Sequence, residues 1–302
     1  KLTRYTGTTS LNYAKKIGDH DFSVGAYNEF VNRLFSSFGY NGFGLTGNFQ
    51  NGAGITNGSA TYIPSVSENK TENALISFFG IGSYSFKNKY FLNGSVRRDG
   101  SSRFSPENRY AVFPSAAFAW KINEESFLKN SKVISDLKLR LGYGITGQQD
   151  GIGNYDYLSY YNLSSNQSMY QFGSTFYNMY SPGGYYSNRK WEQTETFNAG
   201  LDFGLFNNRI TGSVDVYNKK TSDLLNLIGQ PAGANFSNQV IANVGDMENK
   251  GVEINLNSQV IRNSNFTWDL GVNATVNKNT ITNLTIAPDP NYPGNKFGGI
   301  SG

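Results

Sequence analysis

The feature that most constrains the fold is a strict alternation of apolar and polar residues on both sides of a minimal turn. In the stretch GLDFGLFNNRITGSVDVYNKKTSDLL, residues 200–225, the turn is Asn207-Asn208. The apolar positions are Leu201, Phe203, Leu205, Ile210, Val214 and Val216, and the polar ones are Asp202, Thr211, Ser213 and Asp215. Successive side chains of a strand point to opposite faces, so this pattern predicts a hairpin with one apolar and one polar face. A soluble sandwich and a barrel with lipid outside and water inside both produce such a hairpin.

The same alternation recurs along the chain, for example at residues 137–146, 252–257 and 266–276. A strand of about ten residues reaches roughly 33 Å. Strands of globular proteins typically have about five or six residues. We expect about ten strands, near residues 5–13, 21–34, 72–86, 90–98, 110–121, 137–147, 192–205, 209–220, 249–258 and 266–278.

Composition supports an all-β chain and excludes several kinds of site. The 302 residues include 34 glycines, and 15% of them are aromatic, while only 38% are hydrophobic, which suits half-apolar strands joined by Gly- and Asn-rich turns. No apolar run is long enough for a transmembrane helix. The absence of cysteine excludes disulfides, zinc–thiolate sites and thiol nucleophiles. The net charge of +4 comes without a basic stripe, which argues against a nucleic-acid partner.

The connections between the strands favour the barrel. Residues 86–89, 206–209 and 262–265 form tight turns, residues 122–136 contain an expected helical turn, and the loops at 35–71, 99–109, 148–190 and 221–240 are long. If tight and long connections alternate, all long loops lie at one end of the sheet. Short periplasmic turns and long extracellular loops are typical of an antiparallel transmembrane β-barrel. The alternative is edge packing in a soluble β protein.

Aromatic residues gather near the tight turns, and they support the same choice. Phe86, Tyr90 and Phe91 flank one turn, Phe203 and Phe206 a second, and Phe266 and Trp268 a third. Aromatic girdles at the lipid–water interfaces would place them there. In hydrocarbon every backbone N–H and C=O must be paired internally, so strands there close into a ring.

Residues 97–128, RRDGSSRFSPENRYAVFPSAAFAWKINEESFL, resemble the SusC/RagA branch of TonB-dependent outer-membrane transporters. The resemblance continues at residues 137–149, 191–225 and 243–257. It implies a 22-strand barrel, of which this chain holds somewhat under half, together with an N-terminal plug and a TonB box. The chain opens within a strand pattern and closes on a loop, so we expect residues 1–302 to be part of one barrel domain, with the plug and the C-terminal strands outside it.

The resemblance also implies a function. Members of this family import large nutrients, oligosaccharides or oligopeptides, with energy from the TonB complex and with a SusD-like surface lipoprotein as a lid. No bond is made or broken in that process, so we expect no enzyme activity. The alternative is a non-transporting outer-membrane barrel that serves as a surface anchor or as a secretion or structural component.

One long extracellular loop is rich in tyrosine and supplies the candidates for substrate contact. They are Tyr155, Tyr157, Tyr160, Tyr161, Tyr170, Tyr177, Tyr180, Tyr185, Tyr186 and Trp191. Flat aromatic faces can stack on sugar rings or grip a peptide while neighbouring amides form hydrogen bonds. Two other interpretations stay open: the rings form a small core for the loop, or they form part of the surface that docks the lid.

A second group of candidates lies at alternate strand positions and is expected to face the lumen. It comprises Asn93, Ser95, Arg97, Lys138, Arg140, Asp202, Thr211, Asp215, Glu253, Asn255 and Asp269. Their mixed signs suit a water-filled or plug-filled interior without strong ion selectivity. Arg97, Arg98 and Arg103 beside Asp99 are expected to form a local charge network.

The remaining polar residues do not predict a catalytic or metal site. His20 is the only histidine, so no Ser-His-Asp triad can be built, and we expect a solvated turn residue. Glu124 and Glu125 are adjacent and make a poor acid–base pair; a first-turn helix position explains them better.

Two loops raise binding hypotheses that the sequence does not support. Asp150, Asn154 and Asp156 suggest a Ca²⁺ loop, but their spacing is not that of an EF-hand, and Asx-turns explain them better. Residues 47–58 are glycine-rich but lack the Gly-Lys-Ser/Thr of a phosphate loop. No cofactor is predicted.

Overall fold

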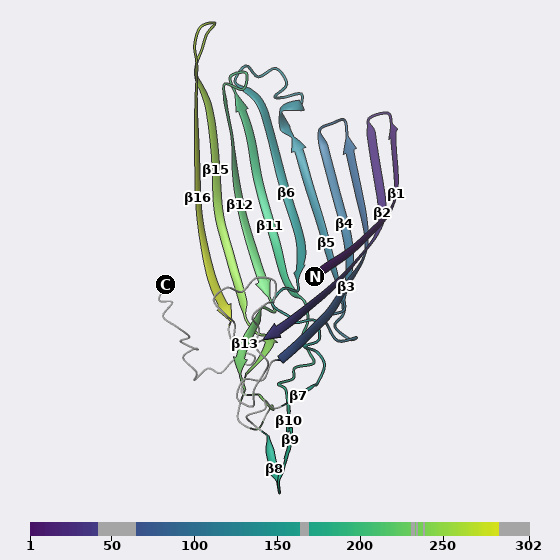
Figure 1. The fold of residues 1–302 in the computed structure, drawn as a ribbon. Coiled ribbons are helices and arrows are strands. Elements are labelled where there is room, and N and C mark those ends of the chain that lie inside the picture. The colour runs from purple at the N-terminus through teal and green to yellow at the C-terminus, as the bar shows by residue number, and fades with distance from the viewer. Residues whose placement is uncertain (42–64, 164–168, 231–232, 234, 238, 284–302) are drawn as a thin grey trace, which may run out of the picture.

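A computed structural model describes residues 1–41, 65–163, 169–230, 233, 235–237 and 239–283. Within these ranges, ten long strands form one antiparallel sheet in which each strand pairs only with its neighbours in sheet order (Figure 1). They are β1 (Leu2–Ile17), β2 (His20–Asn41), β3 (Ser65–Phe86), β4 (Tyr90–Ser101), β5 (Tyr110–Lys121), β6 (Ile134–Gln148), β11 (Glu192–Leu205), β12 (Ile210–Ser222), β15 (Asp246–Arg262) and β16 (Thr267–Asn283).

The ten long strands confirm the strand positions predicted from sequence, but several strands are longer than the alternation indicated. β2 continues to Asn41 and pairs with β3 from Ser65 onward, so both strands extend into the region expected to be loop. Backbone hydrogen bonds hold a ladder together without any side-chain pattern, and pairing therefore continues beyond the apolar stretch.

Short and long connections lie at opposite ends of the sheet, as predicted (Figure 1). At the short-turn end, Lys87, Asn88, Asn207 and Asn208 have φ between 53° and 58°, the left-handed conformation that tight hairpin turns require and that Asn tolerates. The connection after β5 contains a single 3₁₀ turn, η1 (Ile122–Glu124), where the sequence indicated a helical turn.

The long connections contain three short hairpins that the sequence did not predict. They pair β7 (Tyr161–Leu163) with β10 (Tyr180–Pro182), β8 (Tyr170–Phe172) with β9 (Thr175–Tyr177), and β13 (Leu225–Gly229) with β14 (Gln239–Asn243). These hairpins gather at the long-loop end (Figure 1). The glycine-rich stretch 47–58 lies outside the described residues.

The strand register separates an apolar face from a polar face across the whole sheet. Leu201 lies opposite Val214, which in turn lies opposite Ile254. The apolar face is exposed: 46% of Ile254 and 74% of Val276 are accessible. No second sheet covers that face within the described residues, which contradicts a sandwich. No helix in the described ranges is long and apolar enough to cross a membrane.

The best-packed side chains lie at the long-loop end rather than between layers. Phe104, Phe113, Ile152 and Trp191 form a buried cluster, against which Leu75, Ala111, Ile145 and Leu225 pack. Trp191 lies 4.9 Å from Phe104 and 5.6 Å from Phe113 between ring centroids. This cluster anchors the tyrosine-rich loop to the ends of the strands.

Candidate functional site

The register places the predicted lumen residues on one face. Arg140 pairs with Gly200, Gly200 with Asp215, and Asp215 with Glu253, so these positions form one row across four strands. Counting along the paired strands in the same way places four other residues predicted to face the lumen on this polar face: Asn93, Arg97, Asp202 and Asp269.

Arg140 is the centre of an ion-pair network on the polar face. Its Nε donates to Asp202 Oδ2 at 2.8 Å, and its Nη2 donates to Asp202 Oδ1 at 2.8 Å. The same Nη2 lies 2.9 Å from Asp215 Oδ1. The planar guanidinium thus binds one carboxylate in a bidentate manner and reaches a second, a geometry that a lysine cannot reproduce.

Gly200 leaves the space through which Arg140 reaches Asp215. A Cβ atom at Gly200 would lie 2.3 Å from Asp215 Oδ1 and 2.7 Å from Arg140 Nη2. Because Gly200 lies between the two charged residues in the register, any larger side chain would occupy the contact itself. The sequence alone did not indicate a role for this glycine.

Arg97 forms a second network near the long-loop end of the polar face. Its Nε lies 2.7 Å from Asp99 Oδ1, its Nη2 donates to Ser77 Oγ at 2.7 Å, and Glu29 Oε1 lies 3.6 Å away. The guanidinium also lies over the Phe79 ring, 4.7 Å from its centroid. The predicted network around Asp99 therefore exists, with Arg97 as its cation.

Arg98 and Arg103 do not belong to that network, so this part of the prediction was wrong. Arg98 follows Arg97 in the strand and points to the apolar face, where its guanidinium lies over the Tyr110 ring at 4.4 Å. Arg103 lies in the connection after β4 and donates to Asn154 Oδ1 at 3.2 Å.

The tyrosine-rich loop exposes most of its rings. Exposed members of the group are Tyr155, Tyr160, Tyr161, Tyr170, Tyr177, Tyr180 and Tyr185, while Tyr157 and Tyr186 are half-buried. Trp191 differs: only 4% of it is accessible, and its Nε1 donates to the Arg109 carbonyl at 3.1 Å. This burial argues against Trp191 as a residue that contacts substrate and agrees with the alternative in which it belongs to a small core.

A buried arginine that the sequence analysis missed ties two long connections together. Arg189 is 4% exposed; its Nε donates to the Ile241 carbonyl at 2.7 Å, and its Nη1 donates to the Asp156 carbonyl. Burial lowers the pKa of this guanidinium, and the nearby Asp156 carboxylate opposes that shift. Arg189 thereby fixes the tyrosine-rich loop against β14. Only long-range contacts reveal this role, since nothing in the local sequence distinguishes Arg189.

The oxygen atoms of the suspected Ca²⁺ loop accept hydrogen bonds from the protein. Asn154 Oδ1 accepts from Asn73 Nδ2 at 3.1 Å, and Asp156 Oδ2 accepts at 2.9 Å from the N–H of Gly153, three residues earlier in the chain. An Asx-turn would accept from an N–H two residues further on, so this contact of Asp156 is not the expected Asx-turn. Asp150 lies 3.8 Å from Arg103. In the described part of the chain, no group of three or more acidic, histidine or cysteine side chains is arranged for a metal.

The short-turn end carries an aromatic row on the apolar face. His20 lies opposite Phe86, Phe86 opposite Tyr90, and Tyr90 opposite Trp120. Glu125, directly after η1, contacts this row: it accepts from Tyr90 Oη at 2.5 Å and from Trp120 Nε1 at 3.1 Å. The hydrogen bond from Tyr90 is the main reason that the pKa of Glu125 lies below its usual range.

This row changes the interpretation of two sequence candidates. His20 begins β2 and shares a 2.8 Å hydrogen bond with Tyr84 Oη, so it is a member of the aromatic row rather than only a solvated turn residue. Glu125 follows η1 and anchors the row, whereas the sequence suggested only a first-turn helix position. Phe91 lies on the polar face, opposite Ala119.

Comparison with known proteins identifies the family. Residues 2–302 match the family described as TonB dependent receptor-like, beta-barrel. The chain belongs to this family. It is 46% identical over 222 residues to the TonB-dependent receptor SusC of Bacteroides thetaiotaomicron, which covers 74% of this chain and 22% of SusC. It is 37% identical over 254 residues to the TonB-dependent receptor P3 of Formosa agariphila, covering 82% of this chain and 24% of P3.

Solved structures agree with this family and with its SusC/RagA branch. The RagAB peptide transporter superposes with a TM-score of 0.81 at 27% identity, covering 94% of this chain and 31% of that one. The chain thus spans about a fifth to a third of the length of these relatives. TonB-dependent receptors are integral outer-membrane barrels, so the apolar face lies against lipid and the polar face lines the interior.

Proposed function

We propose that the complete protein imports large nutrients, oligosaccharides or oligopeptides, across the outer membrane. In this proposal TonB supplies the energy through a plug domain, and a SusD-like surface lipoprotein closes the barrel as a lid. The identity of 46% to SusC carries the proposal, because it extends over 74% of this chain. The solved relative RagAB is named as a peptide transporter, which supports a large substrate.

The described residues supply parts that suit such a transporter. Arg140 and Arg97 hold their carboxylates in place, so the interior lining is polar but locally neutralised. Exposed tyrosines such as Tyr161 and Tyr180 lie at the long-loop end, where a sugar ring or peptide would first meet the barrel. No covalent chemistry is required of any of them.

Growth of a deletion strain tests the proposal directly. A strain that lacks the complete protein should lose growth on one or a few members of a panel of glycans and peptides, and the intact gene should restore that growth. The same loss is expected in a strain without TonB. Undiminished growth and uptake on every member of a panel that includes the natural nutrient would favour the non-transporting alternative.

The tyrosines are tested by substitution once a substrate is known. Tyr161→Ala and Tyr180→Ala should raise the Kd for the substrate several-fold without changing the amount of barrel in the membrane. Tyr217→Ala, on the interior face of β12, is the control for the loss of a ring elsewhere. Equal Kd values for wild type and both loop variants would leave the loop tyrosines with a packing or lid-docking role.

A further inference from the structure

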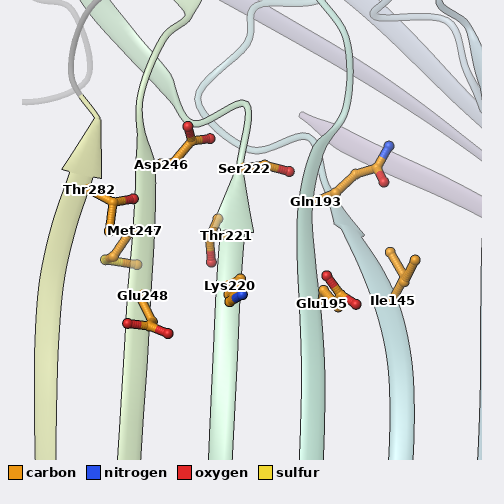
Figure 2. Close-up of a pocket in the computed structure, with 10 residues that line it drawn as sticks. All are labelled: Ile145, Gln193, Glu195, Lys220, Thr221, Ser222, Asp246, Met247, Glu248 and Thr282. Atoms are coloured by element: carbon orange, nitrogen blue, oxygen red, sulfur yellow. The ribbon is translucent and has the colours of Figure 1, made fainter.

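A mixed-charge groove lies on the outward face of the sheet, near the long-loop end. Its volume is about 570 Å³, and Figure 2 shows Ile145, Glu195, Lys220 and Glu248 in a row across neighbouring strands. The register confirms this row, since Lys220 lies opposite both Glu195 and Glu248. Each of these residues lies an even number of positions from an apolar-face residue of its own strand, such as Leu201 or Val214. Their side chains therefore belong to the lipid-facing side and not to the interior.

The height of the groove follows from the length of strand that crosses a membrane. A tilted transmembrane strand needs roughly nine to eleven residues to span the hydrocarbon. Counted from Leu205 at the short-turn end, that length of β11 reaches Glu195; counted from Ile210, it reaches Lys220 on β12. The exposed rings of Tyr143 and Phe197 lie one row below, where an interfacial aromatic girdle is expected. The groove therefore lies at the headgroup level of the outer leaflet.

Three lysines lie near this level on the outward face: Lys220 lines the groove, and Lys250 and Lys278 lie beside it. Lys250 lies directly opposite Lys278, and this pair is one row closer to the short-turn end than Lys220. All three side chains are exposed. Like charges directly opposite each other in a sheet are destabilising. Glu248 lies 3.1 Å from Lys250 Nζ and compensates part of this repulsion. An anion placed between Lys250 and Lys278 would remove the remaining repulsion between the two ammonium groups.

We propose that this groove binds the phosphorylated sugar headgroup of an outer-leaflet glycolipid. The phosphate would lie among Lys220, Lys250 and Lys278, and the sugar hydroxyls would donate to Glu195 and Glu248. The acyl chains would lie on the apolar rows below, beside Val216 and Val252. A headgroup with both hydroxyls and phosphate fits the mixed charges of the groove better than a bare anion, which the lining carboxylates Glu195, Asp246 and Glu248 would repel.

The test measures lipid binding by the complete protein in detergent, by native mass spectrometry and by the shift of its thermal midpoint. The probes are phosphorylated lipid A, the same lipid after dephosphorylation, and inorganic phosphate. Phosphorylated lipid A should bind and raise the midpoint of the wild type. Loss of one charge-assisted contact in Lys220→Gln should raise the Kd about tenfold. Lys220→Arg should keep most of the affinity.

Lys219→Gln is the matched control, because Lys219 is the adjacent lysine and points to the interior face over the Tyr217 ring. It should bind as the wild type does. If Lys220→Gln does not yield folded protein, Lys278→Gln at the same headgroup level makes the same test. Equal Kd values for the Lys219 and Lys220 variants, equal binding of dephosphorylated lipid, or an equal midpoint shift with inorganic phosphate would each overturn the proposal.

Discussion

At the scale of single residues, the charge balance of the interior depends strongly on Arg140. Replacing it with Gln leaves Asp202 and Asp215 without their shared cation. The network is about one-third exposed, so we expect a loss of about 1–2 kcal/mol in the free energy of unfolding rather than the larger cost of a buried pair. Thermal unfolding in detergent measures this loss.

Lys138→Gln provides the control for Arg140, because Lys138 lies on the same face, opposite Asp202. It removes the same charge without removing the bidentate contact. A double-mutant cycle with Asp215→Asn should show coupling between positions 140 and 215. If the Lys138 and Arg140 variants were equally stable, the network would contribute nothing specific.

Gly200 supports a second prediction at this scale. Gly200→Ala should separate Arg140 from Asp215 and reproduce most of the destabilisation caused by Asp215→Asn, because the new Cβ would occupy the contact. Gly142→Ala is a matched control on the adjacent strand and the same face, where no atom lies within 4 Å of the new Cβ. Thermal midpoints that fall equally for both alanine variants would show a general cost of losing a strand glycine instead.

At the scale of elements, the short-turn end is held by the contact between Glu125 and the aromatic row. A carboxylate whose pKa is lower in the folded protein than in the unfolded chain stabilises the fold above its unfolded pKa, about 4.3. That contribution is lost as the pH falls below this value and through the folded pKa. Glu125→Gln should therefore have a smaller drop in thermal midpoint between neutral and acidic pH than the wild type.

Glu124→Gln is the neighbouring control and should keep the wild-type pH response. The comparison isolates Glu125, because both variants remove one carboxylate from the same connection. A pH response of Glu125→Gln identical to that of the wild type would mean that the hydrogen bonds from Tyr90 and Trp120 do not favour the ionised form.

The cluster at the opposite end makes a different prediction. Trp191→Ala removes a buried ring that contacts Phe104 and Phe113, and truncations of this kind cost about 3–5 kcal/mol. We expect the loss to be local, so residues 149–190 should be cut faster by protease on intact cells. Tyr180→Ala, at a 67% exposed position, should leave the cutting rate unchanged. Equal rates for Trp191→Ala and the wild type would refute a packing role.

The elements also show how far the sequence alone could predict this structure. The ten long strands and the lipid-facing pattern were predictable, because contact with lipid on one side imposes a period of two. The pairs β7–β10 and β13–β14 were not predictable, because they lie outside the membrane, where no hydrocarbon imposes an alternating pattern. Arg97 and Arg98 point to different faces because they are consecutive residues of one strand, and this could have been predicted. The burial of Trp191 and Arg189 depends on contacts between distant segments, which one sequence does not reveal.

At the scale of the whole molecule, a closed barrel resists unfolding by detergent. All strand backbone groups in such a barrel pair with neighbours, so its structure persists in sodium dodecyl sulfate until it is heated. The complete protein should migrate faster on gels when unheated than after boiling. Identical migration in the two states would contradict closure of the sheet into a barrel.

The order of the sheet carries a consequence for how such a protein changes over evolutionary time. Each long strand adjoins only the long strands before and after it, and the extra strands are confined to the connections. A hairpin is therefore a removable unit, and its duplication or loss would widen or narrow the pore without rerouting any other segment. The diameter of the barrel can then change through the number of hairpins, while its selectivity changes separately through the loops that the hairpins carry.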